Sequence, residues 1–578
     1  MKTPQNSSVI STRHHHADLV VVGGGLAGLF AAIAAARHGA SVILVQDRPV
    51  LGGNASSEIR MGIMGAHGDN NKETGLLEEI QLDNIYVNPL RRYTRWDDVL
   101  YSAVVREKNI SLLLNTSVQS VDAADGRIRS VTAWNGNEYC TYQISGTYFA
   151  DCSGDGILRL GGADFRIGRE APEEFAEHFT QVGNDDRTMG NSILLQLRRC
   201  AEHRPFIAPD WAYHFTEETI PKNRPLNPDN NNFWWIEYGG NIDTVGDANV
   251  IAFELKRIAY GVWEYMKNHP DGRCRNYELD WIGSLPGKRE SCRFIGDHLL
   301  TQNDIMNGGI FPDVVCYGGW TLDDHHPDAF FNNGPQSLHH KPPTPFGIPY
   351  RCFYSRNIDN LFFAGRNISC THMGMSATRV MATCALMGQA VGTAAALCHS
   401  HECSPRDIGR LHLAELQNTL EDDDVMLPGR WRQIPAVTRD AQCSHDVVRD
   451  GIDRNWQGQD HGAWVATGEA ITLAWPTPQT LTACRVVFDS ELNFQGKRML
   501  KLEALDEFKP MPAMLTKRFH IDMLIDDQWR TVISQEQWHH RLFRQALPQQ
   551  PCRAIRLVVD ETWGGSEQKA HVFAYDVR

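Results

Sequence analysis

The sequence predicts an α/β protein in which an α/β domain is interrupted by an inserted α+β domain and followed by a C-terminal all-β sandwich. The first observation behind this fold class is a glycine-rich strand–helix–strand pattern near the N-terminus. The second is that another apolar strand and a long helix of small residues return only after residue 345. The third is that short alternating segments separated by turns fill residues 429–578.

Composition sets the broad class of the protein. The 578 residues are 42% hydrophobic and 22% charged, which is typical of a globular protein. A formal net charge of −14 excludes nucleic acid as a general partner, because phosphate binding needs a basic surface. Fourteen cysteines without CxxC spacing favour reduced thiols in a cytoplasmic protein.

The N-terminus and two histidine-containing runs are expected to carry no special function. Residues 1–17 lack the apolar core of a signal peptide and are predicted to be a flexible leader that contains His14, His15 and His16. The run from Cys398 to Cys403 is interpreted as a helix end, so we predict no metal site. The longest apolar stretch, from Leu19 to Ala36, is interrupted by glycines, so no membrane span is predicted.

The first element is a complete βαβ unit. Residues 18–22 form a Val-rich strand, residues 41–45 a second strand, and an Ala-rich helix lies between them. The connecting loop reads Gly23-Gly-Gly25-Leu26-Ala27-Gly28. In this Rossmann-type context Gly23 permits the tight turn, Gly25 lets a pyrophosphate approach the backbone, and Gly28 lets helix and strand pack closely. The N-terminus of the helix then offers unpaired N–H groups to phosphate.

The end of the second strand leaves two alternatives for ribose binding. Spacing places Gln46 where an acidic residue normally binds the adenosine ribose, with Asp47 and Arg48 following. Either Asp47 binds the ribose hydroxyls or Gln46 does so as a neutral group. No basic cluster marks a site for a 2′-phosphate.

A second glycine pair indicates which dinucleotide binds. It lies in Asp47-Arg-Pro-Val-Leu-Gly-Gly-Asn-Ala-Ser-Ser-Glu58, and NAD-specific domains have no need of it. Here the chain resembles bacterial FAD-dependent oxidoreductases that have a glutathione-reductase-like Rossmann domain and share the DRPVLGGNASSE signature. The resemblance implies that the pyrophosphate and ribityl chain are lined by Gly52, Gly53, Asn54 and Ser57, and that the flavin ring is approached by Arg60 and Met61.

Further stretches resemble the same family in the same order, over roughly residues 17 to 420. Val118 resembles the residue whose backbone meets the adenine, and Ser153 and Gly154 lie in a stretch that resembles the turn that closes over the dinucleotide. Gly365-Arg366 stands where many flavoproteins have Gly-Asp, so Arg366 is expected in the ribityl–phosphate region.

A slim helix is predicted over residues 373–398. Gly388, Gly392 and several alanines let it pack tightly against the Rossmann domain. The resemblance implies that its N-terminus, with Gly374 and Ser376, lies near the flavin pyrimidine, where the helix dipole favours negative charge.

Residues 166–344 interrupt the FAD-binding segments 18–165 and 345–428 and are predicted to be an α+β substrate domain. Arg289 and Arg293 match the family's Arg-Glu-Ser-x-Arg stretch and either line the substrate pocket or form structural ion pairs. His372 follows the FAD loop directly and is expected to act as a neutral base beside the ring. The further candidates are two loop histidines, His326 and His340, as bases, Arg293 as an orienting group, and Tyr350 and Arg351 as substrate contacts.

The C-terminal part of the chain has a different sequence pattern from the segments before it. A helical tail is predicted at residues 404–420, with Ser404 as the N-cap. Residues 429–578 are predicted to form a sandwich that resembles the discoidin or galactose-binding-like fold. Core packing is the expected role of its tryptophans, and stacking on sugar rings is the alternative.

These features favour an FAD-dependent oxidoreductase that takes hydride from a secondary hydroxyl of a carbohydrate or glycoside to flavin N5. One variant is transient oxidation followed by elimination of a glycosidic substituent. The alternatives are a reductase of an activated C=C bond in a carboxylate and a carbohydrate-binding flavoprotein without turnover. A small-molecule substrate, an electron acceptor and a homo-oligomer are the expected partners.

Overall fold

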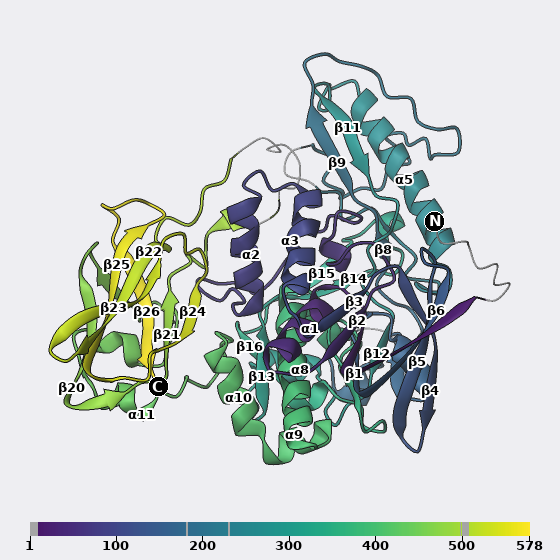
Figure 1. Cartoon of the computed structure of the whole chain (residues 1–578). Coiled ribbons are helices and arrows are strands. Elements are labelled where there is room, and N and C mark those ends of the chain that lie inside the picture. Colours follow the sequence, from purple (N-terminus) through teal and green to yellow (C-terminus); the bar gives the residue numbers. More distant parts are fainter. Residues whose placement is uncertain (1–9, 181–182, 229–231, 498, 500–507) are drawn as a thin grey trace, which may run out of the picture. The chain divides into compact units, whose positions relative to one another are not determined.

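The computed structural model describes residues 10–180, 183–228, 232–497, 499 and 508–578, and its chain is traced from purple to yellow in Figure 1. It divides into two compact units. The first unit contains the described residues up to 66 and residues 92–416, and the second contains residues 67–91 and most of the chain after residue 416. The predicted α/β class with an all-β C-terminal part is confirmed.

A seven-stranded mixed sheet organises the first unit. Its order is β3-β2-β1-β6-β5-β4, with β17 also paired to β6. Strands β1, β2, β3, β6 and β17 run parallel; β5 pairs antiparallel to β6, and β4 pairs antiparallel to β5. The strand bounds are β1 Ser11–Val22, β2 Val42–Val45, β3 Ile110–Leu113, β4 Thr116–Ala124, β5 Arg127–Asn135, β6 Cys140–Asp151 and β17 Leu361–Phe363.

The expectation of a flexible leader is wrong for residues 11–17. These residues form the first half of β1 and pair in register with residues 140–146 of β6. The physical reason is that β6 is 12 residues long and offers its backbone donors and acceptors to a partner beyond the buried part of the sheet. Residues 1–9 lie outside the described part of the chain.

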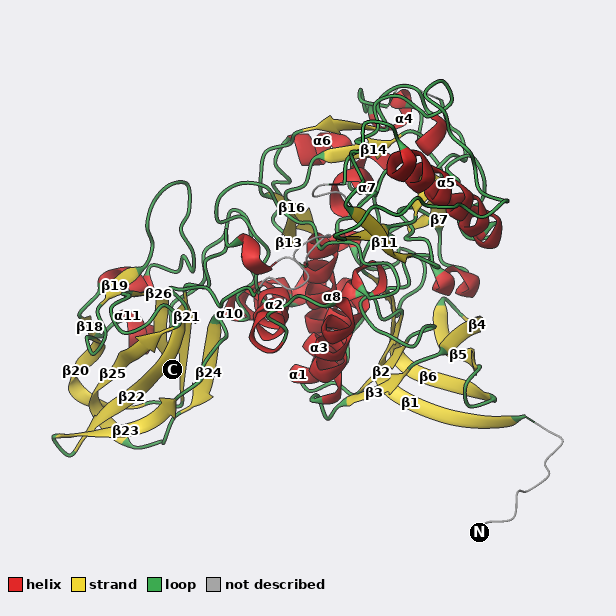
Figure 2. Ribbon diagram, turned by 90° about the horizontal axis from the view of Figure 1, so that it is seen from above, coloured by secondary structure: helices red, strands yellow, loops and turns green. Residues whose placement is uncertain are grey.

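Helices α1 (Leu26–Arg37) and α8 (Met381–His401) lie side by side (Figure 2) and pack at very short range. A Cβ on Gly388 would lie 2.0 Å from the carbonyl oxygen of Ala27, and one on Gly392 would lie 2.1 Å from that of Ala31. The predicted slim helix is therefore present, but it is broken in two. A short helix α7 (His372–Thr378) ends before Arg379, and α8 begins after Val380.

Helix α8 is also the one helix of the described chain that is long and apolar enough to cross a membrane, although 89% of that stretch is buried inside the protein.

The inserted region is part of the first unit rather than a separate compact body. It consists of two-stranded antiparallel sheets and the helix α5 (Ala248–Asn268), whose apolar face covers a core that includes Trp235 and Trp263. The predicted strand at residues 232–238 is confirmed only for β10. The strand bounds are β7 Phe165–Ile167, β8 Asn191–Ser192, β9 Leu195–Arg199, β10 Glu237–Tyr238, β11 Tyr277–Ile282, β12 Cys292–Phe294, β13 Val314–Gly318, β14 Leu322–His325, β15 Ser337–His340 and β16 Phe346–Pro349.

Shorter helices complete the first unit and lead out of it. The predicted helical tail is formed by two helices, and Ser404 caps the first of them through the N–H of Asp407, as expected. The bounds are α3 Tyr93–Val105, α4 Pro172–Phe175, α6 Gln302–Met306, α9 Pro405–Leu411 and α10 Leu413–Asp422.

The second unit is an antiparallel sandwich of a five-stranded sheet, β18-β20-β25-β22-β23, and a four-stranded sheet, β19-β26-β21-β24. Its core contains the inward residues of both sheets, and Trp538 and Trp563 pack against it, whereas Trp464 and Trp529 are exposed. The bounds are β18 Gln442–Cys443, β19 Ala463–Val465, β20 Ala470–Thr480, β21 Ala483–Phe488, β22 Thr516–Ile525, β23 Gln528–Gln535, β24 Leu542–Ala546, β25 Pro551–Thr562, β26 Ala570–Val577 and α11 Ala436–Arg439.

One early segment belongs to this second unit. Residues 67–91, with helix α2 (Leu76–Val87), were expected in the dinucleotide-binding domain but form one compact body with the sandwich. A buried ion pair and a hydrogen bond hold the segment there. Glu78 of α2 pairs with Lys497, and the guanidinium of Arg91 donates to the carbonyl of Gly496.

Candidate active site

A cavity of about 270 Å³ opens in the first unit, where β1 and β2 end and helices α1 and α8 begin. Ligands of open α/β sheets bind at this carboxyl edge of the strands. Gly23 has a φ of +103°, and a Cβ there would lie 2.6 Å from the backbone of Cys152. In contrast, the space above Gly25 is open, since an added Cβ would meet only the Cα of Gly53 at 4.0 Å. This open backbone fits a pyrophosphate.

The two predicted glycine loops lie directly against each other in the lining of the cavity. The N–H of Gly52 donates to the carbonyl of Gly24 at 2.8 Å, and Gly25 and Gly52 form an isolated parallel bridge. The predicted cofactor residues that line the cavity are Gly23, Gly25, Leu26, Ala27, Gln46, Asp47, Arg48, Gly52, Gly53, Asn54, Val118, Ser153, Gly154, Gly365 and Arg366.

Six predicted cofactor residues lie outside the lining. Gly28 has the packing role expected of it, since a Cβ would lie 1.8 Å from the carbonyl oxygen of Gly23. Arg60 instead stacks its guanidinium 4.2 Å over the ring of Trp281. The other four are held by packing or local hydrogen bonds: Ser57, Met61, Gly374 and Ser376.

Gln46 and Asp47 both line the cavity but differ in availability. The side-chain oxygen of Gln46 accepts the N–H of Gly24 at 2.7 Å, and its nitrogen donates to the carbonyl of Val50 at 3.2 Å. The side chain of Asp47 is 62% exposed, and its carboxylate lies 3.8 Å from the Nε of Arg48. Gln46 therefore braces the glycine loop, and Asp47 is the better candidate for the ribose hydroxyls.

Two cations and one carboxylate form another part of the cavity lining. Asp155 accepts from Arg366 at 2.7 Å and from Lys288 at 2.6 Å. Burial raises the pKa of Asp155, but these two cations outweigh burial and hold it below its usual value. The three side chains line the cavity with a net positive charge, which suits a phosphate. Asp155 and Lys288 were not predicted, although each adjoins a residue that was.

Arg379 is the most informative residue that the sequence analysis missed. It lies in the break between α7 and α8, lines the cavity, and donates to the carbonyl and carboxylate of Asp323 at 3.1 Å. Its Nε is buried without a hydrogen-bond partner among the described residues, so it is free to donate to a bound group. A signal was present, because Arg379 is the one charged residue between Met373 and Cys398.

The expectation that His372 is a neutral base is not supported by its surroundings. Its Nδ1 lies 3.0 Å from Glu290, its Nε2 lies 2.9 Å from Asp324, and the ring is buried. Burial lowers the pKa of His372, but the two carboxylates outweigh burial and raise it to about 10. His372 is thus an imidazolium at neutral pH, with both N–H groups donated to carboxylates, and it has no lone pair for a substrate proton.

The predicted arginine contacts are structural ion pairs, the other interpretation that the sequence left open. Arg293 is fully buried and pairs with Glu290 and with Glu170 at 2.7 Å. Arg289 donates to two backbone carbonyls and lies 3.5 Å from Glu237. Arg293 is thus held by two carboxylates and Arg289 by one, so the expected role of Arg293 in orienting the substrate is corrected.

Tyr350 and Arg351 also serve the fold. The buried hydroxyl of Tyr350 donates to the carbonyl of Pro405 at 2.7 Å. Arg351 makes a two-point ion pair with Asp313 at 2.9 and 3.2 Å. Neither residue lines the cavity, and their role as substrate contacts stays a prediction.

The two histidines predicted to lie on loops differ in environment, and for His340 that placement is wrong, because it belongs to a strand. His326 is 45% exposed and lies 3.7 Å from Asp328. His340 lies at the end of β15, opposite Leu322 of β14, with its ring stacked 3.7 Å from that of Phe179. Burial lowers the pKa of His340, partly offset by Asp324, so its imidazole is neutral at neutral pH. His340 is thus the neutral histidine, able to accept a proton, that was expected at His372.

Comparison with known proteins places this geometry in context. Residues 18–420, more than half of the chain, match the model of a family described as FAD dependent oxidoreductase. A fumarate reductase (cytochrome) of Shewanella frigidimarina is 48% identical over 54 residues, which are 9% of this chain and 10% of that protein. The chain thus aligns with about a tenth of the length of the curated relatives it matches.

The chain matches solved structures only at low identity and low TM-score. A geranylgeranyl bacteriochlorophyll reductase-like protein of Thermoplasma acidophilum is 11% identical with a TM-score of 0.32, over 72% of this chain and 89% of that one. A family 32 carbohydrate-binding module of Streptococcus pneumoniae is 10% identical with a TM-score of 0.19, over 25% of this chain and 97% of the module.

Proposed function

The chain belongs to the FAD-dependent oxidoreductase family, and on this basis we propose that it oxidises a secondary hydroxyl group of a neutral, polyhydroxylated substrate, a carbohydrate or glycoside. When bound, FAD supplies the hydride acceptor, flavin N5. The cofactor would be held by the glycine loops around Gly25 and Gly53, by the wall of Lys288 and Arg366, and by Arg379.

The choice of substrate rests on the pairing of positive with negative side chains around β14 and α7. Arg379 pairs with Asp323, and His372 with Asp324 and Glu290. Arg289 and Arg293 are likewise neutralised by Glu237, Glu170 and Glu290. A substrate carboxylate would find each of these cations already paired, whereas hydroxyl groups can donate to the carboxylates.

A hydroxyl that loses hydride must also lose a proton, and His340 is the group that fits this step. Its imidazole is neutral. On the neighbouring strand it lies opposite Leu322, and the next residue, Asp323, pairs with Arg379 of the cavity lining. We assign the proton to a ring nitrogen of His340. His372 does not take part in proton transfer and is a positioning residue, because its two N–H groups fix Asp324 and Glu290.

The test is anaerobic mixing of the purified flavoprotein with a panel of sugars, glycosides and enoates while the long-wavelength flavin absorbance is followed. We expect a sugar or glycoside to bleach the flavin. His340→Gln should retain FAD and bleach at least about a hundredfold more slowly, as general base catalysis contributes 10²–10⁴-fold. His326→Gln is the matched control and should bleach at the wild-type rate.

Three outcomes separate the alternatives. Products without consumption of an electron acceptor would favour transient oxidation followed by elimination. Turnover of enoates by the reduced protein alone would favour the C=C reductase and refute the proposal. A flavin that no member of the panel bleaches, with no product formed, would favour a carbohydrate-binding flavoprotein without turnover.

A further inference from the structure

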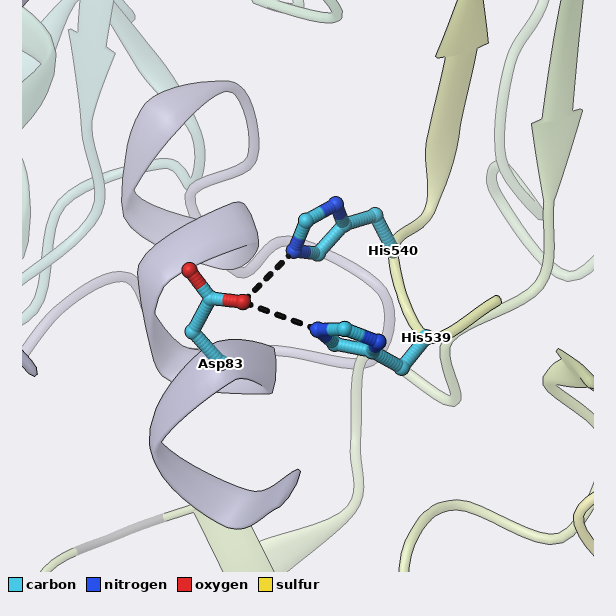
Figure 3. A group of neighbouring side chains, drawn as sticks. All are labelled: Asp83, His539 and His540. Atoms are coloured by element: carbon cyan, nitrogen blue, oxygen red, sulfur yellow. Dashed lines mark hydrogen bonds and ion pairs between the residues drawn. The ribbon is translucent and has the colours of Figure 1, made fainter. Parts of the chain in front are cut away.

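Three side chains of metal-ligating types converge in the second unit (Figure 3). Asp83 lies on α2, and His539 and His540 lie in the loop before β24. The Nε2 atoms of His539 and His540 lie 2.9 and 2.8 Å from the same carboxylate oxygen of Asp83. All three candidate ligand atoms lie within 4.8 Å of one another.

The donor set and the spacing suit a divalent transition-metal ion. Two imidazole nitrogens and one carboxylate oxygen are a common protein ligand set for Zn²⁺ and its neighbours. With metal–ligand bonds of about 2.0–2.2 Å in a tetrahedron, ligand atoms lie roughly 3.4 Å apart. Each Nε2 therefore needs to withdraw from the Asp83 oxygen by roughly half an ångström, which a small side-chain rotation provides.

A backbone carbonyl fixes the orientation of the His539 ring. Its Nδ1 lies 3.1 Å from the carbonyl oxygen of Gln537, which can only accept, so Nδ1 carries a hydrogen. The Nε2 of the ring then faces the carboxylate oxygen of Asp83 at 2.9 Å. A backbone carbonyl on the other ring nitrogen is the usual outer partner of a metal-binding histidine.

Aromatic packing holds both rings in place. The ring of Tyr86, one turn after Asp83 on α2, stacks on His539 with a centroid distance of 4.1 Å and an angle of 9°. His540 lies edge-on to Trp538 at 5.3 Å. The three ligand side chains are 12–22% exposed, so an ion can enter and water can complete its coordination.

We propose that Asp83, His539 and His540 bind one divalent transition-metal ion of the Zn²⁺ class and thereby fasten residues 67–91 to the sandwich. The ligands come from positions more than 450 residues apart in sequence. The sequence alone predicts no metal site, and this proposal revises that prediction.

The experiment uses the full-length flavoprotein, freed of metal with a chelator and titrated with Zn²⁺ or Co²⁺. We expect one equivalent to bind tightly and Co²⁺ to give the visible absorption of a tetrahedral or five-coordinate N/O site. Asp83→Asn and His540→Gln should each weaken binding at least about tenfold. Zn²⁺ should also raise the melting temperature of the wild-type protein and not that of Asp83→Asn.

Controls address the other histidine clusters of the chain. His412→Gln alters an exposed group with His401 and Glu415, and a double substitution of His14 and His16 to Gln alters the histidine run of β1. Both control variants should keep the tight equivalent. Circular dichroism and FAD content establish that each variant is folded. If Asp83→Asn and His540→Gln bind metal as the wild type does, or if the folded wild type binds none, the proposal is refuted.

Discussion

Replacing His372 with glutamine tests the buried imidazolium directly. The group has a pKa of about 10 in the folded protein against 6.5 for an ordinary histidine, so its protonated form stabilises the fold. Because the folded pKa is the higher one, this stabilisation is complete below about pH 6.5 and disappears as the pH rises through about 10. Burial of the ring keeps solvent screening small.

The size of the effect follows from the two pKa values. The full contribution at low pH corresponds to roughly 5 kcal/mol, of which roughly 3–4 kcal/mol is lost between pH 7 and pH 10. The difference in free energy of unfolding between the wild type and His372→Gln should shrink by that amount over this range.

The assay is urea denaturation at pH 7, 8, 9 and 10, followed by the fluorescence of released FAD, which reports on the first unit. Titrating groups that the two proteins share cancel in the difference. His326→Gln removes an exposed histidine and should give a profile parallel to that of the wild type. If the wild type and His372→Gln also have parallel profiles from pH 7 to pH 10, the ring carries no raised pKa and the ion-pair assignment fails.

Three further substitutions test the packing and the cavity. Gly388→Ala places a methyl group 2.0 Å from the carbonyl oxygen of Ala27, so thermal unfolding should show a loss of about 1–3 kcal/mol together with lower FAD retention. Arg293→Gln removes the buried guanidinium that Glu170 and Glu290 share, and urea unfolding should show a loss of about 3–5 kcal/mol. Arg379→Gln removes the guanidinium of the cavity wall, and titration of the apoprotein should show FAD affinity lower by about tenfold or more.

Each of these substitutions has a matched control. Gly136→Ala meets its nearest atom at 3.8 Å and should be neutral, so equal losses for both glycines would contradict the close-packing argument. Arg351→Gln breaks an ion pair whose arginine is 41% exposed and should cost at most about 1 kcal/mol. A cost for Arg293→Gln as small as that would show that its pairs are not held in the interior. Arg379→Lys keeps the charge and should recover part of the affinity; unchanged affinity in Arg379→Gln would remove the residue from the site.

The glycine positions of the cofactor site could be predicted from sequence because they obey local rules. A strand, a turn and a helix of fixed length bring Gly23, Gly25 and Gly28 to one place whatever the rest of the chain does. The second pair, Gly52 and Gly53, lies close enough in sequence for the same unit to carry it. The small residues of α8 likewise predict that another helix packs closely against it, although they do not identify α1 as that helix.

The roles of charged residues depended on the tertiary structure. A charge acts through space, and its neighbours come from distant segments: His372 acquires its high pKa from Glu290 and Asp324, 82 and 48 residues away. No local pattern distinguishes a histidine between two carboxylates from the less charged site of His340. For the same reason, no local pattern predicts the group of Asp83, His539 and His540. Nor does one predict that residues 67–91 form a compact unit with the sandwich. The sequence by itself thus determined the backbone cradle for the dinucleotide, and only the tertiary structure decided which side chains carry protons, charges and ions.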